Sequence, residues 1–96
     1  MTEIIYSPEA DDDLVRVWHY SAENYGAAQA DRYIATIRKR IVGLTTGRTA
    51  SQKADHVAPG MRRALAERHA VFFREAEGAV VVVRVLHQGI DVGYVR

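Results

Sequence analysis

Residues 61–87 read MRRALAERHAVFFREAEGAVVVVRVLH, and this stretch decides the fold. It contains three short segments rich in β-branched, aromatic and small apolar residues. They are residues 61–66, 69–75 and 80–87. The sequences between them, Glu67-Arg68 and Glu77-Gly78, are typical of tight turns. The stretch therefore predicts three antiparallel strands joined by hairpins.

The chain before this stretch begins with a short β-rich segment, residues 2–6, which predicts one more strand. Ser7-Pro8-Glu9 follows and is typical of a helix start, because serine can cap free amides and proline suits the first turn. Asp11-Asp12-Asp13 adds negative charge that complements the positive end of a helix. Apolar residues recur at helical spacing over 10–21 and include Trp18. We expect Trp18 to be buried between this helix and the sheet.

A second helical stripe of apolar residues covers residues 30–44, and Asn24-Tyr25-Gly26 breaks the pattern between the two stripes. Two helices with a short break between them are expected to form an antiparallel hairpin. Residues 45–60 are polar and show no periodicity, so we expect a loop there. The predicted order is βααβββ. It corresponds to one α+β domain over residues 1–96, with the helical hairpin packed on one face of an antiparallel sheet.

Composition limits the classes of function. The chain has 96 residues, no cysteine and a net charge of +1, which excludes disulfides and thiolate metal sites and disfavours a strongly electrostatic nucleic-acid binder. No apolar run reaches the roughly 18 residues of a membrane helix. No signal-peptide pattern is visible, so we expect a cytoplasmic protein. The common nucleotide-binding, metalloprotease and serine-hydrolase motifs are missing, and we expect neither a cofactor nor a metal.

Alternation along the three predicted strands indicates which side chains share a face of the sheet. With two-residue turns, one face would carry Arg62, Ala64, His69, Val71, Phe73, Val80, Val82, Arg84 and Leu86. Both faces are largely apolar, but the helical hairpin can cover only one of them. We therefore expect an uncovered apolar face that carries arginines. Monomeric proteins rarely leave a large apolar patch bare, so the pattern favours a binding partner.

Six motifs together carry a family resemblance. In the first half they are Ser-Pro-Glu-Ala-x-x-Asp-Leu at residues 7–14, Trp18-x-Tyr20, and Tyr25-Gly26-x-x-Gln29-Ala30-x-x-Tyr33. In the second half they are Gly60-Met61-Arg62-Arg63, Arg68-His69-x-x-x-Phe73-Arg74, and Arg84-Val85-Leu86-His87-Gln88-x-x-Asp91. In this order and spacing, the chain resembles the ParE toxins of the RelE/ParE superfamily over nearly its whole length. It departs at Thr45-Thr46-Gly47-Arg48, where the family often has a proline and then a glycine.

The resemblance implies the toxin of a type II toxin–antitoxin module. ParE-type proteins are associated with poisoning of DNA gyrase. A ParD-like antitoxin neutralises them in a hetero-oligomer by wrapping its extended C-terminal segment around the toxin. The expected antitoxin-binding residues are Arg62, Phe73, Val82, Arg84 and Leu86, with the apolar ones contacting apolar side chains and the arginines contacting carboxylates. Such a toxin would have no catalytic residue, would not contact a membrane, and would meet DNA only through the antitoxin or gyrase.

Two other functions stay open at this point. One is the RelE-like ribosome-dependent messenger-RNA endoribonuclease, which activates a ribose 2′-hydroxyl and stabilises the charge that develops on the phosphate. His69 and His87 could then serve as acid and base. The nuclease branch tends to carry an arginine where His69 stands, and Arg62 or Arg84 would have to substitute for it. The other is a degenerate, non-toxic binding module.

Overall fold

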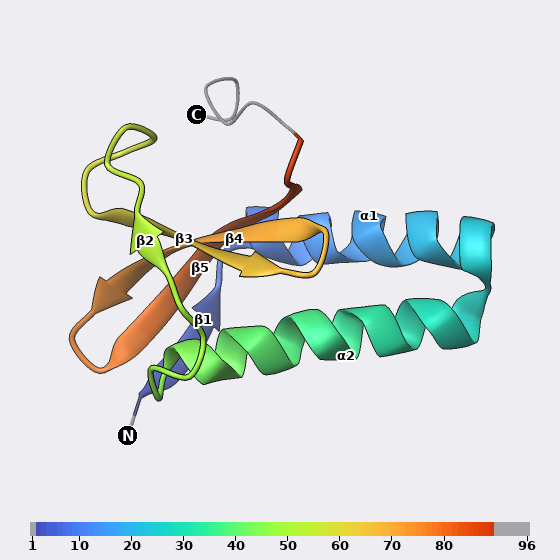
Figure 1. Ribbon diagram of the computed structural model, residues 1–96, viewed down its shortest axis with the longest axis horizontal. Helices are drawn as coiled ribbons and strands as arrows, with labels where there is room; N and C mark the ends of the chain where they lie inside the picture. The colour runs from blue at the N-terminus through green and yellow to red at the C-terminus, as the bar shows by residue number, and fades with distance from the viewer. Residues whose placement is uncertain (1, 90–96) are drawn as a thin grey trace.

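The computed structural model describes residues 2–89, so the motif residue Asp91 lies outside the described part of the chain. The elements in chain order are β1 (Glu3–Tyr6), α1 (Pro8–Tyr25), α2 (Ala27–Leu44), β2 (Gln52–Lys53), β3 (Met61–Ala66), β4 (His69–Ala76) and β5 (Ala79–His87). The five strands form one sheet in the order β1-β5-β4-β3-β2. The two helices lie side by side as a hairpin against this sheet (Figure 1).

The α+β class and the βααβββ order are confirmed, with two differences in the sheet. The first strand, β1, pairs with β5 in parallel, so the sheet is mixed, while β2 to β5 pair in the expected antiparallel manner. The segment predicted as a plain loop contains β2, which pairs with β3 through Gln52 and Lys53. These two exposed polar residues carry no strand pattern of their own, because their pairing depends on the neighbouring strand.

The start of α1 is fixed as its sequence predicts. Ser7 is the N-cap, and its hydroxyl accepts a hydrogen bond from the Ala10 N–H at 3.0 Å. The same hydroxyl donates to the carbonyl oxygen of Val83 at 2.7 Å, and so ties the helix start to the neighbouring strand β5. At the other end, Gly26 joins α1 to α2 with a φ of 91°, which favours glycine.

The main core lies between the helical hairpin and the sheet. Its buried members are Ala10, Leu14, Ile37, Ile41, Ala64, Ala66, Val71, Phe73, Val80, Val82 and Val85. Trp18 is not among them, so its prediction as a core residue between the helices and the sheet is wrong. Its side chain is half-buried, and its indole N–H donates to Asp31 on α2 at 2.8 Å. Trp18 therefore ties one helix of the hairpin to the other.

A β-bulge between β4 and β5 changes which side chains share a face. Phe72 pairs with Arg84, whereas Phe73 pairs with Val82, so Val83 is an extra residue on β5. Beyond the bulge the alternation is inverted. Val85 joins the core under the helices, and Leu86 joins the cluster on the opposite face. The prediction that Leu86 shares a face with Phe73 and Val82 is therefore wrong, because strict alternation does not continue through a bulge.

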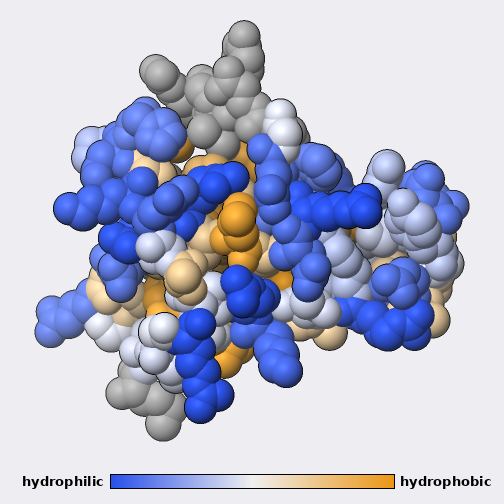
Figure 2. All heavy atoms as spheres, in the orientation of Figure 1, coloured by the Kyte–Doolittle hydropathy of each residue, from blue (hydrophilic) through white to orange (hydrophobic). Residues whose placement is uncertain are grey.

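The sheet face away from the helices is also less bare than expected. Residues 54–58 pack there, so the expected loop supplies part of a second cover. This second cluster contains Ala54, Met61, Ala70, Phe72 and Leu86, with Val57, Ala58 and Val83 packed against it. Figure 2 shows a central band of hydrophobic side chains on the face in view, surrounded by hydrophilic ones. An entirely uncovered apolar face is therefore not present among the described residues.

Candidate functional site

A groove opens where the first strand ends. β1 pairs with β5 only as far as Tyr6 opposite Val82, and α1 lies beside the remainder of β5. The groove has a volume of about 980 Å³ and lies between the helical hairpin and the adjoining ends of β4 and β5. Its lining contains Asp13, Arg16, Val17, Tyr20, Ser21, Tyr25, Gln29, Tyr33, Glu67, Arg68, His69, Arg84, Val85, Leu86 and His87.

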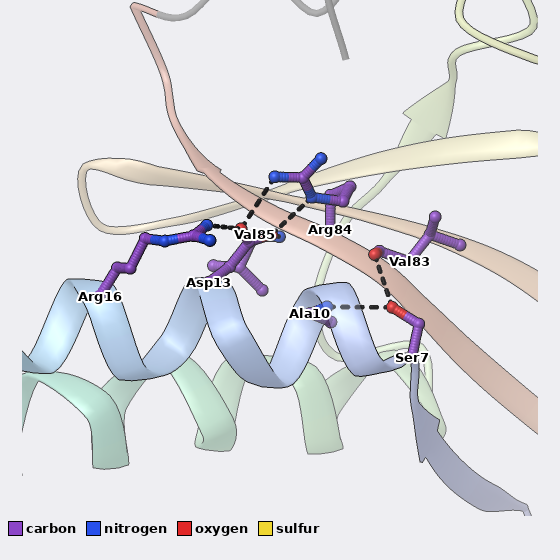
Figure 3. Close-up of polar contacts among 7 residues, drawn as sticks. All are labelled: Ser7, Ala10, Asp13, Arg16, Val83, Arg84 and Val85. Atoms are coloured by element: carbon purple, nitrogen blue, oxygen red, sulfur yellow. Dashed lines mark hydrogen bonds and ion pairs between the residues drawn. The ribbon is translucent and has the colours of Figure 1, made fainter. Parts of the chain in front are cut away.

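The carboxylate of Asp13 organises one wall of the groove (Figure 3). It accepts hydrogen bonds from Arg84 Nε at 2.7 Å and Arg84 Nη2 at 2.9 Å, and a third from the Val85 N–H at 2.9 Å. Arg16 approaches the same carboxylate at 3.5 Å. The hydrogen bond to Asp13 raises the pKa of the Arg84 guanidinium, although burial opposes this shift. Arg84 is therefore held in one position by a buried counter-charge.

A cluster of three rings forms the opposite part of the lining. The Tyr33 hydroxyl lies 2.7 Å from His69 Nδ1, and the Arg68 N–H donates to this hydroxyl at 3.1 Å. His69 and His87 face each other across β4 and β5, with ring centroids 5.6 Å apart. Burial lowers the pKa of His69, and the neighbouring His87 lowers it further, while Asp13 opposes the shift. Burial likewise raises the pKa of Tyr33. His69 is therefore neutral at neutral pH.

The structure brings together only some of the residues proposed from the sequence. His69, His87, Arg84 and Leu86 all line the groove. Phe73 and Val82 are 2% and 0% exposed and lie in the core beneath the helices, because they point to the covered face of the sheet. A partner segment cannot reach these two side chains while the hairpin covers them.

Arg62 also lies away from the groove. Its guanidinium donates to the Ser51 hydroxyl at 3.0 Å and forms an ion pair with Glu75 at 3.8 Å. Arg62 is four positions from Ala66, the residue that pairs with His69. At the usual rise per residue of a strand, this places Arg62 about 13 Å from the histidine end of the sheet. Of the four residues expected for an RNA-cleaving site, His69, His87 and Arg84 therefore line one groove, and Arg62 does not.

Sequence reasoning missed Asp13 and Tyr33 as members of the site. Asp13 was interpreted only as a charge near the helix start, yet it lies on the buried stripe of α1 next to Leu14. A charged residue on an apolar stripe requires a partner, and this signal could have identified it. Tyr20 and Tyr25 were also missed, although they are 65% and 64% exposed on the groove. No pattern in the sequence distinguishes such surface tyrosines from packing residues.

Two further properties of the described residues concern metal ions and membranes. No three histidine, cysteine or acidic side chains within residues 2–89 are grouped so that they could hold a metal ion. Neither α1 nor α2 is long and apolar enough to cross a membrane.

Solved structures with the same fold include proteins of toxin–antitoxin systems. The chromosomal ParDE toxin–antitoxin system from P. aeruginosa matches with a TM-score of 0.78 and 18% identity, over 91% of this chain and 96% of that one. The E. coli DinJ–YafQ complex matches with a TM-score of 0.62 and 11% identity, over 91% and 93% of the two chains. At these identities the structures establish the RelE/ParE-like fold.

Sequence comparison is more specific. The model of the family described as the ParE toxin of the type II toxin–antitoxin system, parDE, matches residues 4–92. Toxin ParE of Escherichia coli is 35% identical over 92 residues, which cover 95% of this chain and 89% of the relative. Toxin ParE1 of Mycobacterium tuberculosis strain H37Rv is 33% identical over 89 residues, covering 92% and 91%. The chain therefore belongs to the ParE toxin family of type II toxin–antitoxin systems.

Proposed function

We propose that this protein inhibits DNA gyrase as the toxin of its module and that a ParD-like antitoxin neutralises it by occupying the groove. Membership of the ParE family supports the toxin activity, because gyrase inhibition is the usual role of ParE proteins. Complexes such as DinJ–YafQ among the structural relatives support a protein partner. The observation that carries the proposal for the partner is the chemical character of the groove.

The groove combines the features that a peptide segment requires. Its lining includes the partly buried Val17, which can contact an aliphatic side chain. Tyr20 and Tyr25 are about two-thirds exposed, and tyrosine is a frequent anchor at protein interfaces. Polar groups distributed along the lining can then fix the position of the segment. The antitoxin is therefore expected to lie between the hairpin and the ends of β4 and β5.

The pair His69 and His87 favours RNA cleavage as a second candidate. Two histidines in a groove whose ring centroids are 5.6 Å apart can act as acid and base. However, phosphate chemistry also needs a cation that is free to stabilise developing charge. The guanidinium of Arg84 is occupied by Asp13 through two hydrogen bonds, and Arg62 lies away from the groove. Neither arginine expected from the sequence is therefore free for this role, and we favour binding over catalysis.

Expression without antitoxin separates these two functions. Wild type, His69→Gln and His87→Gln would be induced, and DNA breaks, translation and messenger-RNA ends would be followed over time. We expect gyrase-dependent DNA breaks while translation continues at first, and we expect both variants to retain them. Loss of a general acid or base costs about 10²–10⁴ in rate, so a nuclease would lose its toxicity in either variant. Early translation arrest with cut messages, abolished by either substitution, would overturn the gyrase proposal.

A further inference from the structure

The hydrogen bonds around His69 bear on which ring nitrogen carries its proton. The Tyr33 hydroxyl accepts from the Arg68 N–H at 3.1 Å, and its own hydrogen has no acceptor among the described residues except His69 Nδ1 at 2.7 Å. A hydroxyl has one hydrogen to donate, and a neutral imidazole has one nitrogen that can accept it. We therefore assign Nδ1 of His69 as the acceptor, which places the proton of the neutral ring on Nε2.

The neighbouring histidine is fixed in the same tautomer by a different donor. The Gly89 N–H donates to His87 Nδ1 at 3.2 Å, so the proton of the neutral ring is again on Nε2. Both rings line the groove, and their centroids are 5.6 Å apart. Residues 2–89 provide no hydrogen-bond partner for Nε2 of either ring. The groove thus contains two adjacent N–H donors whose tautomers are set in advance.

We propose that these two donors form an oxyanion site, in which Nε2–H of His69 and of His87 binds a carboxylate from an aspartate or glutamate of the partner segment. The inference rests on the proposed function, because it specifies what the antitoxin places in the groove. Two oriented donors can bind one carboxylate through hydrogen bonds to its charged oxygens. At the partly buried His69, a neutral donor does this without a charge that would need a partner in the free toxin.

The charges around the groove favour a carboxylate over a nucleic-acid backbone. The lining contains three arginines, Arg16, Arg68 and Arg84, and two carboxylates, Asp13 and Glu67, so the charge apart from the histidines is 3 − 2 = +1. Asp13 does not repel an incoming anion strongly, since Arg84 already pairs with it. Nucleic-acid surfaces need many cations to neutralise successive phosphates. A single anion site beside an apolar lining instead fits one acidic side chain of an amphipathic peptide.

Nuclear magnetic resonance of the ¹⁵N-labelled 96-residue chain tests the site, with sodium acetate as the probe. Before acetate is added, we expect both His69 and His87 to show the Nε2–H tautomer. Acetate should then shift the Nε2 signals of both rings and leave the exposed His56 unchanged at matched ionic strength. His87→Ala removes one of the two donors and should raise the acetate dissociation constant about tenfold.

Two tyrosine variants test whether the Tyr33 hydroxyl positions the His69 ring or only supports the fold. Tyr33→Phe removes the hydroxyl that fixes His69, so we expect a mixture of tautomers and a smaller acetate shift at that ring. Tyr6→Phe, which changes a tyrosine outside the groove, should leave both signals as in wild type. An unchanged His69 tautomer in Tyr33→Phe, with the fold intact, would overturn the assigned hydrogen-bond direction.

Other results would reject the site itself. Equal acetate shifts at His56, or no shift at His69 and His87, would overturn it. A much stronger response to inorganic phosphate than to acetate would overturn the carboxylate assignment and point to a phosphate backbone instead. If coexpressed antitoxin still neutralises the toxin while acetate has no effect, only this inference fails. If antitoxin does not bind at all but acetate does, the proposed function fails and the anion site stands.

Discussion

The two halves of β5 are held in different ways. Residues 79–82 pair with β4 on one side and with β1 on the other, so backbone hydrogen bonds surround them. Residues 84–87 pair with β4 alone, and on the other side the Ser7 hydroxyl and the Asp13 carboxylate bond to Val83, Arg84 and Val85. Where backbone pairing ends, side chains of the α1 region replace it. The groove opens at this transition.

The largest effect is expected at the backbone-paired half. Phe73 lies opposite Val82 and is 2% exposed in the core beneath the helices. Phe73→Ala should lower the free energy of unfolding by about 3–5 kcal/mol, because it removes a large buried ring and leaves a cavity. Urea denaturation followed by circular dichroism measures this loss. A loss below about 1 kcal/mol would be incompatible with the packing described above.

A smaller but still large loss of unfolding free energy is expected in the second half of β5, where side chains replace backbone pairing. Asp13→Ala would leave the Val85 N–H without its acceptor and Arg84 without its counter-charge. Because the Arg84 side chain is 26% exposed, water can partly replace the carboxylate, and we expect a loss of about 2–3 kcal/mol. Asp12→Ala is the matched control on the exposed side of the same helical turn. Equal stability losses in the two variants would show that the contacts of Asp13 with Arg84 and Val85 do not stabilise the fold.

A substitution between the two helices should lower the free energy of unfolding less. Trp18→Phe keeps an aromatic ring and removes the indole N–H that donates to Asp31. This bond is solvent-exposed, so we expect a loss of only about 0.5–1.5 kcal/mol in the same urea experiment. A loss as large as that of Phe73→Ala would place Trp18 in the core after all, as its helical spacing predicted.

The smallest expected effect is a pH dependence at the groove. Burial lowers the pKa of His69 in the folded protein below its ordinary value of 6.5, so the unfolded chain binds the proton more readily. The contribution of His69 to stability is therefore complete above pH 6.5 and is lost as the pH falls from there towards the folded pKa. His69→Gln should flatten this part of the curve of unfolding free energy against pH. An identical slope in wild type and variant would exclude His69 as its source.

The elements that depend on nearby residues were predictable from the sequence. The start of α1 follows from Ser7 and Pro8, and the bounds of β3 follow from local apolar segments and turns. The bulge at Phe72 and Phe73 was not predictable, because it arises only when two whole strands are paired.

Long-range polar contacts were the other part that the sequence left open. Asp13 meets the Val85 N–H across 72 positions of the chain, and nothing near Asp13 in the sequence indicates that partner. The family resemblance identified the class of protein correctly, but it did not locate the groove. The groove depends on where β1 ends relative to β5, which is a property of the folded sheet.

The most direct test of the account measures antitoxin affinity in toxin variants that differ at the groove. The cognate antitoxin would be titrated against wild type, Tyr25→Ala and Arg62→Ala by calorimetry. We expect Tyr25→Ala to weaken binding by about 2 kcal/mol, roughly thirtyfold, because it removes an exposed aromatic anchor of the groove. Arg62→Ala should bind as wild type does, since Arg62 is held by Ser51 and Glu75 outside the groove. Unchanged affinity in Tyr25→Ala together with a large loss in Arg62→Ala would contradict the proposal that the antitoxin occupies this groove.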